Sequence, residues 1–195
     1  MTPRLQFDEP THTYRFDGEV RPSVTQVMQG LSQYGIVPAD VLEAAQKRGT
    51  RVHSMCQFYD ECDLDESSVA PEDVGYLHAW IRFRADTQAM FTLIEKPLYS
   101  TRYGFAGTPD RFGVVHRTQY VLDIKTTAGQ PHRVWGIQTA AYRALIAESR
   151  GEIGTYKRAT VQLRPDGTYL FHAWNDADDW PAFLSLINLR NWSKQ

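Results

Sequence analysis

Two carboxylates and a lysine lie close together in the stretch GTPDRFGVVHRTQYVLDIK, which runs from Gly107 to Lys125. Asp110 stands in a Gly/Pro turn that opens one apparent strand, and Asp123 and Lys125 stand at the end of the next. We therefore expect the three side chains to converge at one edge of a small sheet. Carboxylates that hold a divalent cation, with an ammonium group beside the attacking water, are what a nuclease requires.

Alternation along the second strand points Asp123 and Lys125 to one face and Ile124 to the other. Ile124 should lie in the core, with its backbone carbonyl available as a further metal ligand. Mg²⁺ prefers oxygen ligands and takes one or two carboxylates, which Asp110 and Asp123 supply. Lys125 could orient or help deprotonate the attacking water and stabilise charge that develops on a phosphate.

An acid and a lysine two positions apart are also an ordinary exposed pair on a strand, so the context decides. Asp110 precedes Asp123 by 13 residues, which is enough for one strand, a turn and a return. Glu95 stands in the strand before that, so three acids on three successive strands can meet. For Glu95, a role as an ordinary surface carboxylate explains the sequence as well as a role in the site does.

Hydrophobic periodicity predicts five helices, the first of them capped by Ser23, at residues 24–31, 39–61, 74–88, 132–148 and 176–192. The β-rich segments are residues 13–16, 19–21, 91–100, 105–115, 120–124, 155–163 and 168–174, with hairpin turns at Asp17-Gly18 and around residues 165–167. This order predicts an α/β or α+β protein with a central mixed sheet flanked by helices. Gly49 lies inside the second predicted helix. It could mark a bend or a close approach of another backbone segment, or it could simply be tolerated there.

Length and composition predict one domain. The chain has 195 residues, of which 42% are apolar and 23% charged, enough to bury a core. We expect a helical N-terminal part at about residues 23–88 and a catalytic part at about residues 91–192. With no membrane span or targeting segment in the sequence, the expected location is the cytoplasm. Cys56 and Cys62 should be free thiols, and two cysteines do not support a zinc or iron–sulfur centre.

Charge is less informative. The formal net charge of −2 does not favour a nucleic-acid partner, because Lys and Arg provide most of the affinity for phosphates. Several of the counted carboxylates would face cations in an acidic metal site, which weakens this objection. Arg48 and Arg51 lie close together with Lys47 on the second predicted helix, either as a solvated face or as a contact for DNA.

The motifs together resemble the PD-(D/E)XK nuclease superfamily, in particular its RecB-like and phage exonuclease branch. GTPD is followed by LDIK, and then by a helix that carries Gln138 and Tyr142 in a Q-x-x-x-Y pattern. An upstream helical His53 and the segment Pro22-Ser23-Val24-Thr25 are also similar to that branch. The resemblance covers roughly residues 20–145. It is specific as a combination, although each motif is weak alone.

The resemblance implies a restriction-endonuclease-like core and roles for individual residues. Asp110, Asp123 and the Ile124 carbonyl would bind one or two Mg²⁺ or Mn²⁺ ions, with Glu95 and His53 as further ligands. The catalytic set would be Lys125, Asp110, Asp123, Gln138 and Tyr142, and the DNA contacts Arg48, Arg51, Gln138 and Tyr142. Without the family, Tyr142 and His53 would be interpreted as core residues. The iron–sulfur subgroup of the branch is not matched.

The function expected from these residues is metal-dependent DNA hydrolysis, by an exonuclease acting on DNA with a free end. The phage-like pattern favours recombination, repair or DNA processing in a bacterial or phage-infected host, with a single-strand-binding or annealing protein as a partner. Two alternatives stay open. One is a structure- or sequence-specific endonuclease of the same fold, and the other is a non-catalytic DNA-binding accessory module.

Overall fold

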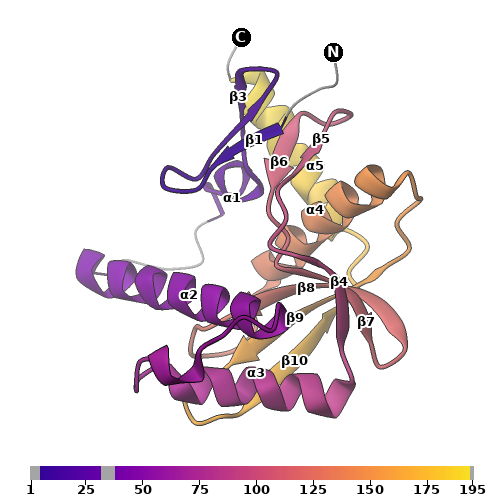
Figure 1. Cartoon of the computed structure of the whole chain (residues 1–195). Coiled ribbons are helices and arrows are strands. Elements are labelled where there is room, and N and C mark those ends of the chain that lie inside the picture. The colour runs from indigo at the N-terminus through magenta and orange to yellow at the C-terminus, as the bar shows by residue number, and fades with distance from the viewer. Residues whose placement is uncertain (1–4, 32–37, 194–195) are drawn as a thin grey trace.

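A five-stranded mixed sheet forms the centre of the molecule. The structure is a computed structural model that describes residues 5–31 and 38–193 (Figure 1). The strand order is β10 (Tyr169–Trp174), β9 (Lys157–Leu163), β8 (Thr118–Lys125), β7 (Arg111–Val115) and β4 (Met90–Ile94). β8 and β9 are parallel and the other pairs antiparallel, so the predicted mixed sheet is confirmed.

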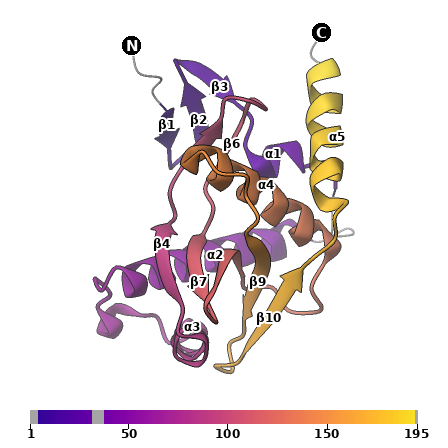
Figure 2. The same cartoon turned by 90° about the vertical axis from the view of Figure 1, so that its right-hand side faces the viewer.

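Helices cover both faces of this sheet (Figure 2). α2 (Ala39–Asp60) and α3 (Val74–Thr87) pack against one face, where Val52, Trp80 and Ile124 belong to one buried cluster. On the other face, α4 (Arg133–Arg150), α5 (Asp179–Trp192) and the short α1 (Val24–Val27) contribute to a second cluster. α4 is also the crossover that joins the parallel strands β8 and β9, as a parallel pair requires. Both faces are thus apolar, and Ile124 lies in the core as predicted.

Two smaller sheets lie beside this core. One consists of β1 (Leu5–Asp8), β2 (Thr13–Phe16) and β3 (Glu19–Arg21), and the other of β5 (Leu98–Ser100) and β6 (Phe105–Gly107). Asp17 and Gly18 both have positive φ, +53° and +82°, as the predicted Asp-Gly hairpin turn requires. The ring of Phe16 stacks on that of Tyr99 at 4.1 Å, which joins the two sheets.

Several predicted boundaries were wrong. The segments 91–100 and 105–115 are each divided into two strands, because Glu95 has a φ of +41° and prolines follow at positions 97 and 109. The helix predicted over 24–31 ends at Val27, although Ser23 caps it and forms a capping box with Gln26. A short 3-10 helix, η1 (Glu66–Ser68), lies in the acidic loop before α3.

Cys56 is buried and Cys62 exposed, and both are free, as predicted. Within the described ranges, no helix has both the length and the apolar character that a bilayer-spanning segment needs.

Two helical glycines should respond to alanine in opposite ways. A Cβ at Gly49 would meet Thr126 Oγ1 at 3.8 Å, an ordinary contact, so helix propensity should dominate. We expect Gly49→Ala to raise the free energy of unfolding by up to about 1 kcal/mol in urea denaturation. A Cβ at Gly136 would lie 2.6 Å from Asp179 Oδ2, which is too close for the two atoms. Gly136→Ala should therefore lower the free energy of unfolding. Equal effects at the two positions would contradict this packing.

Candidate metal and nucleic-acid site

Breaks between strands bring the acids of the site together. Glu95 directly follows β4, Asp110 directly precedes β7, and Asp123 lies in β8. The Glu95 N–H donates to the Asp110 carbonyl at 3.0 Å, which extends the pairing of β4 and β7 by one residue. Glu95 adopts its positive φ at this point, a strained conformation that is often found at functional sites.

The pairing of β7 with β8 places Asp110 beside Asp123. Arg111 lies opposite Leu122 in the register, and Asp110 Oδ2 accepts a hydrogen bond from the Ile124 N–H at 2.6 Å. Asp110 is 5% exposed and Asp123 1% exposed, so both carboxylates are almost completely removed from water.

His53 reaches the same point from α2. One ring nitrogen, Nε2, lies 3.1 Å from the Ile124 carbonyl oxygen. The other, Nδ1, lies 3.5 Å from Glu95 Oε1 and 3.6 Å from Asp110 Oδ2. His53, Glu95 and Asp110 each offer a possible ligand atom within 4.8 Å of one another, and the Ile124 carbonyl is adjacent.

Lys125 connects the acids to α4. Its Nζ lies 2.8 Å from Asp123 Oδ2 and donates to Gln138 Oε1 at 2.9 Å. Gln138 Nε2 in turn donates to the Tyr142 hydroxyl at 3.1 Å. The ammonium group also lies 5.7 Å from the centre of the Trp135 ring. The sequence-predicted pair on α4 therefore orients Lys125.

The electrostatics of the site are unbalanced. Burial raises the pKa of Asp110, and it raises the pKa of Asp123 to about 6 despite the nearby Lys125. For His53, burial lowers the pKa, but Asp110, Glu95 and Asp123 outweigh this effect and raise it to about 9. Burial raises the pKa of the Tyr142 hydroxyl too, so the group stays protonated. The buried carboxylates thus favour added positive charge.

A hard divalent cation fits this donor set. Two carboxylates, a backbone carbonyl and a third acid provide oxygen ligands, and an imidazole lies beside them. Asp123 Oδ2 is buried and, apart from its ion pair with Lys125, has no hydrogen-bond donor among the described residues. A buried carboxylate oxygen with an unused lone pair is suited to bind a metal ion.

A cavity of about 1040 Å³ opens over these residues. Its lining includes all eight of the residues that the sequence placed at the metal and on α4, namely His53, Glu95, Asp110, Asp123, Ile124, Lys125, Gln138 and Tyr142. The structure therefore brings these residues to one concave surface.

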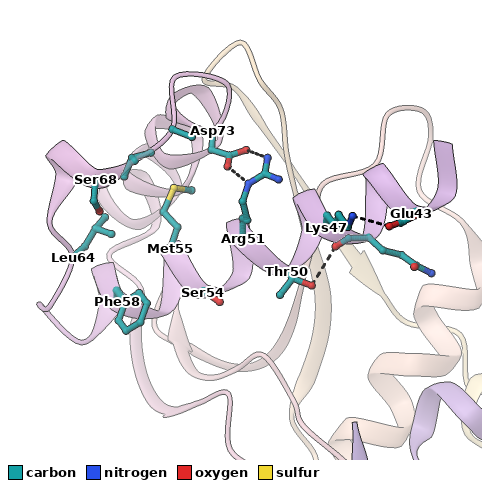
Figure 3. A pocket seen from close by; sticks show the side chains of 13 residues that line it. Glu43, Lys47, Thr50, Arg51, Ser54, Met55, Phe58, Leu64, Ser68 and Asp73 are labelled. Atoms are coloured by element: carbon teal, nitrogen blue, oxygen red, sulfur yellow. Dashed lines mark hydrogen bonds and ion pairs between the residues drawn. The ribbon is translucent and has the colours of Figure 1, made fainter. Parts of the chain in front are cut away.

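Arg48 and Arg51 do not line this cavity. Arg51 lies at a second cavity, of about 800 Å³, on the side of α2 toward the loop before α3 (Figure 3). There its Nε donates to Asp73 Oδ2 at 2.6 Å and its Nη2 to Asp73 Oδ1 at 3.1 Å. Lys47 pairs with Glu43 at 2.6 Å on the same rim. Arg51 and Lys47 are thus paired with acids, and a DNA contact at Arg48 or Arg51 stays a prediction.

Sequence reasoning missed Arg111, the residue after Asp110. Its side chain is fully buried, and its Nη1 donates to Glu95 Oε1 at 3.0 Å and to the Asp110 carbonyl at 2.7 Å. Its Nε donates to Asp60 Oδ2 at 2.7 Å, and Asp60 also pairs with Arg84 and accepts from Trp80 Nε1. The sequence did contain a signal, since Arg111 stands within an otherwise apolar strand. A buried arginine needs an acidic partner, so this position could have been predicted to form a buried ion pair.

Removal of Asp60 should be costly, because the buried Arg111 loses one of its two acidic partners and Arg84 and Trp80 lose theirs. We expect Asp60→Ala to lower the free energy of unfolding by about 3–5 kcal/mol in urea denaturation. The exposed pair of Lys47 and Glu43 provides a control, since Lys47→Ala should change stability by less than about 0.5 kcal/mol. A loss for Asp60→Ala no greater than that of the control would contradict a structural role for this ion pair.

Three solved structures show some likeness to this chain. An alkaline exonuclease, LHK-Exo, from Laribacter hongkongensis has 17% identity and a TM-score of 0.43, over 89% of this chain and 91% of that one. The same enzyme in complex with dAMP has 14% identity and a TM-score of 0.40, over 89% of this chain and 87% of that one. The structure of SSO0001 has 15% identity and a TM-score of 0.38, over 77% of this chain and 72% of that one.

These values are too low to establish a family. No protein-family model matches the sequence, and no curated protein is detectably similar to it.

Proposed function

We propose that this protein is a Mg²⁺- or Mn²⁺-dependent deoxyribonuclease of the PD-(D/E)XK type. The observation that supports the proposal best is the grouping of Asp110, Asp123, the Ile124 carbonyl and Lys125 at one end of the inner strands β7 and β8, open to a cavity. In this proposal the whole chain is one nuclease domain. The order of motifs, with Gln138 and Tyr142 on the following helix, supports the same assignment.

Asp110, Asp123 and the Ile124 carbonyl would hold the ion, with Glu95 and His53 as neighbouring donors. When bound, the ion would act as a Lewis acid and lower the pKa of a water molecule. Arg111 restricts Glu95 through its hydrogen bond, so the acid keeps its place beside Asp110 whether or not the ion is present.

Lys125 is the second chemical element. Its ammonium group stands next to Asp123 and is oriented by Gln138, so it can hold the attacking water by a hydrogen bond and stabilise negative charge on the phosphate. Tyr142 keeps Gln138 in place through the hydrogen bond between Nε2 and its hydroxyl. Hydrolysis then gives one fragment that ends in a phosphate and one that ends in a hydroxyl.

Exonuclease action is the favoured mode within this proposal. The active residues line a partly open cavity that is bordered by α2 and by the N-terminal sheet. A strand end enters such an enclosure more readily than the interior of a long duplex. Linear and covalently closed circular DNA distinguish the modes, because only an endonuclease cuts the closed circle.

Two substitutions test the mechanism directly. With Mg²⁺ or Mn²⁺, we expect the wild type to degrade end-labelled linear DNA, and Asp123→Ala and Lys125→Ala each to lower the rate by at least about 10²-fold, since each removes charge stabilisation. Gel analysis of the products gives the rates. Arg82→Ala is the control, because this side chain is exposed and pairs only with Asp86 among the described contacts.

Unchanged rates in both variants would overturn the mechanism. Absence of DNA hydrolysis by the wild type with either ion would favour a DNA-binding accessory role instead.

A further inference from the structure

The hairpin of β1 and β2 forms part of the wall of the site cavity. It contributes Phe7, Glu9, Pro10 and His12 to the lining, whereas α2 contributes Gly49 and Thr50 among others. Figures 1 and 2 both place the N-terminal sheet above α2. A strand that enters the cavity along this wall would contact the hairpin.

The hairpin is fixed relative to the acids. Tyr14, in β2, is 1% exposed, and its hydroxyl is hydrogen bonded to Thr108 Oγ1 at 2.8 Å. Thr108 belongs to the short loop between β6 and β7 that carries Asp110. The position of the hairpin is thus tied to the residues that would hold the metal.

The hairpin displays aromatic rings at the cavity. Phe7 stacks on Tyr14 with 4.6 Å between ring centres, and His12 lies edge-on to both rings, at 5.3 and 5.4 Å. His12 is exposed and has a φ of +50°, held by the hydrogen bond from its N–H to the Glu9 carbonyl at 3.1 Å. Partial burial of its ring lowers the pKa of His12, so the ring is uncharged at neutral pH. A neutral ring on a fixed turn is a good stacking surface.

Charges in the cavity define which part of a nucleotide faces which wall. Lys125 is the one Lys or Arg that lines the cavity within the described residues. The hairpin instead contributes Glu9, which repels a phosphate. The acids on the opposite wall repel a phosphate too unless the proposed metal ion offsets their charge. With that ion bound, a phosphate would lie toward the ion and Lys125, while the attached base faces the rings of the hairpin. Aromatic contact with unpaired bases is a common mode of single-strand binding.

We propose that Phe7 and His12 form a stacking surface for an unpaired base of the strand that enters the site, so that the protein engages single-stranded DNA ends. This inference rests on the proposed function, because it takes the cavity to be the DNA path. A base paired in a duplex is stacked between its neighbours and cannot reach such a ring.

The test is binding of a fluorescein-labelled oligothymidylate by anisotropy, with Ca²⁺ in place of Mg²⁺ and a gel to verify that the oligonucleotide stays intact. We expect His12→Ala and Phe7→Ala to weaken binding about tenfold or more, the loss of one base contact. His12→Phe should restore most of the affinity, since it keeps a ring. Val20→Ala is the control in the same sheet, because Val20 is 56% exposed and does not line the cavity.

An oligonucleotide of abasic sugars separates stacking from a structural effect. We expect it to bind His12→Ala and the wild type equally, since it has no base to stack. The proposal would be overturned if His12→Ala lost affinity equally for the abasic and the thymidine oligonucleotides, or if it lost affinity for neither. Phe7→Ala perturbs the packing on Tyr14 and could unfold the hairpin, so the exposed His12 provides the decisive variants.

The two proposals fail separately. If DNA hydrolysis depends on Asp123 but oligothymidylate binding does not depend on His12, the stacking surface is wrong and the nuclease stands. If the wild type hydrolyses no DNA but shows the His12-dependent binding, the nuclease is wrong and the stacking surface stands.

Discussion

The buried ion pair of Asp60 and Arg111 is the contact on which the site depends. Asp60 is the last residue of α2, and Arg111 is the first residue of β7, directly after Asp110. The same pair therefore joins the helix that carries His53 to the strand break that carries the acids. Both side chains are removed from water, and such a pair costs desolvation unless its hydrogen bonds are nearly complete. Here Trp80, Arg84 and Glu95 provide the additional partners.

An acidic cluster lies beside this pair. Two acids, Glu95 and Asp110, and the imidazole of His53 offer ligand atoms within 4.8 Å of one another, and Lys125 is engaged with Asp123 and Gln138. A protein selected only for stability would replace such a cluster with apolar side chains. In the proposed function, a divalent cation and a phosphate would give the cluster a use, and the rings of the N-terminal hairpin line the same cavity.

Sequence patterns predicted much of this arrangement. The alternation of Asp123, Ile124 and Lys125 fixed their faces, and the spacing of Gln138 and Tyr142 placed both on one side of α4. The Gly/Pro turn at Asp110 was visible in the sequence, but the left-handed backbone of Glu95 was not, since its place depends on pairing between β4 and β7. For Arg111 the pattern offered only an arginine within an apolar strand, because its partner Asp60 is distant in sequence. Phe7 and His12 contact each other and Tyr14, and only the fold shows that they line the site cavity.

The most direct measurement is a crystal structure of the protein grown with Mn²⁺, with anomalous scattering data collected at the manganese edge. The account predicts an anomalous peak between the carboxylates of Asp110 and Asp123, next to the Ile124 carbonyl, and no peak at that position in crystals of Asp110→Asn. A clear map without manganese among these residues, or with manganese bound only elsewhere, would contradict the claim that these acids form a metal site.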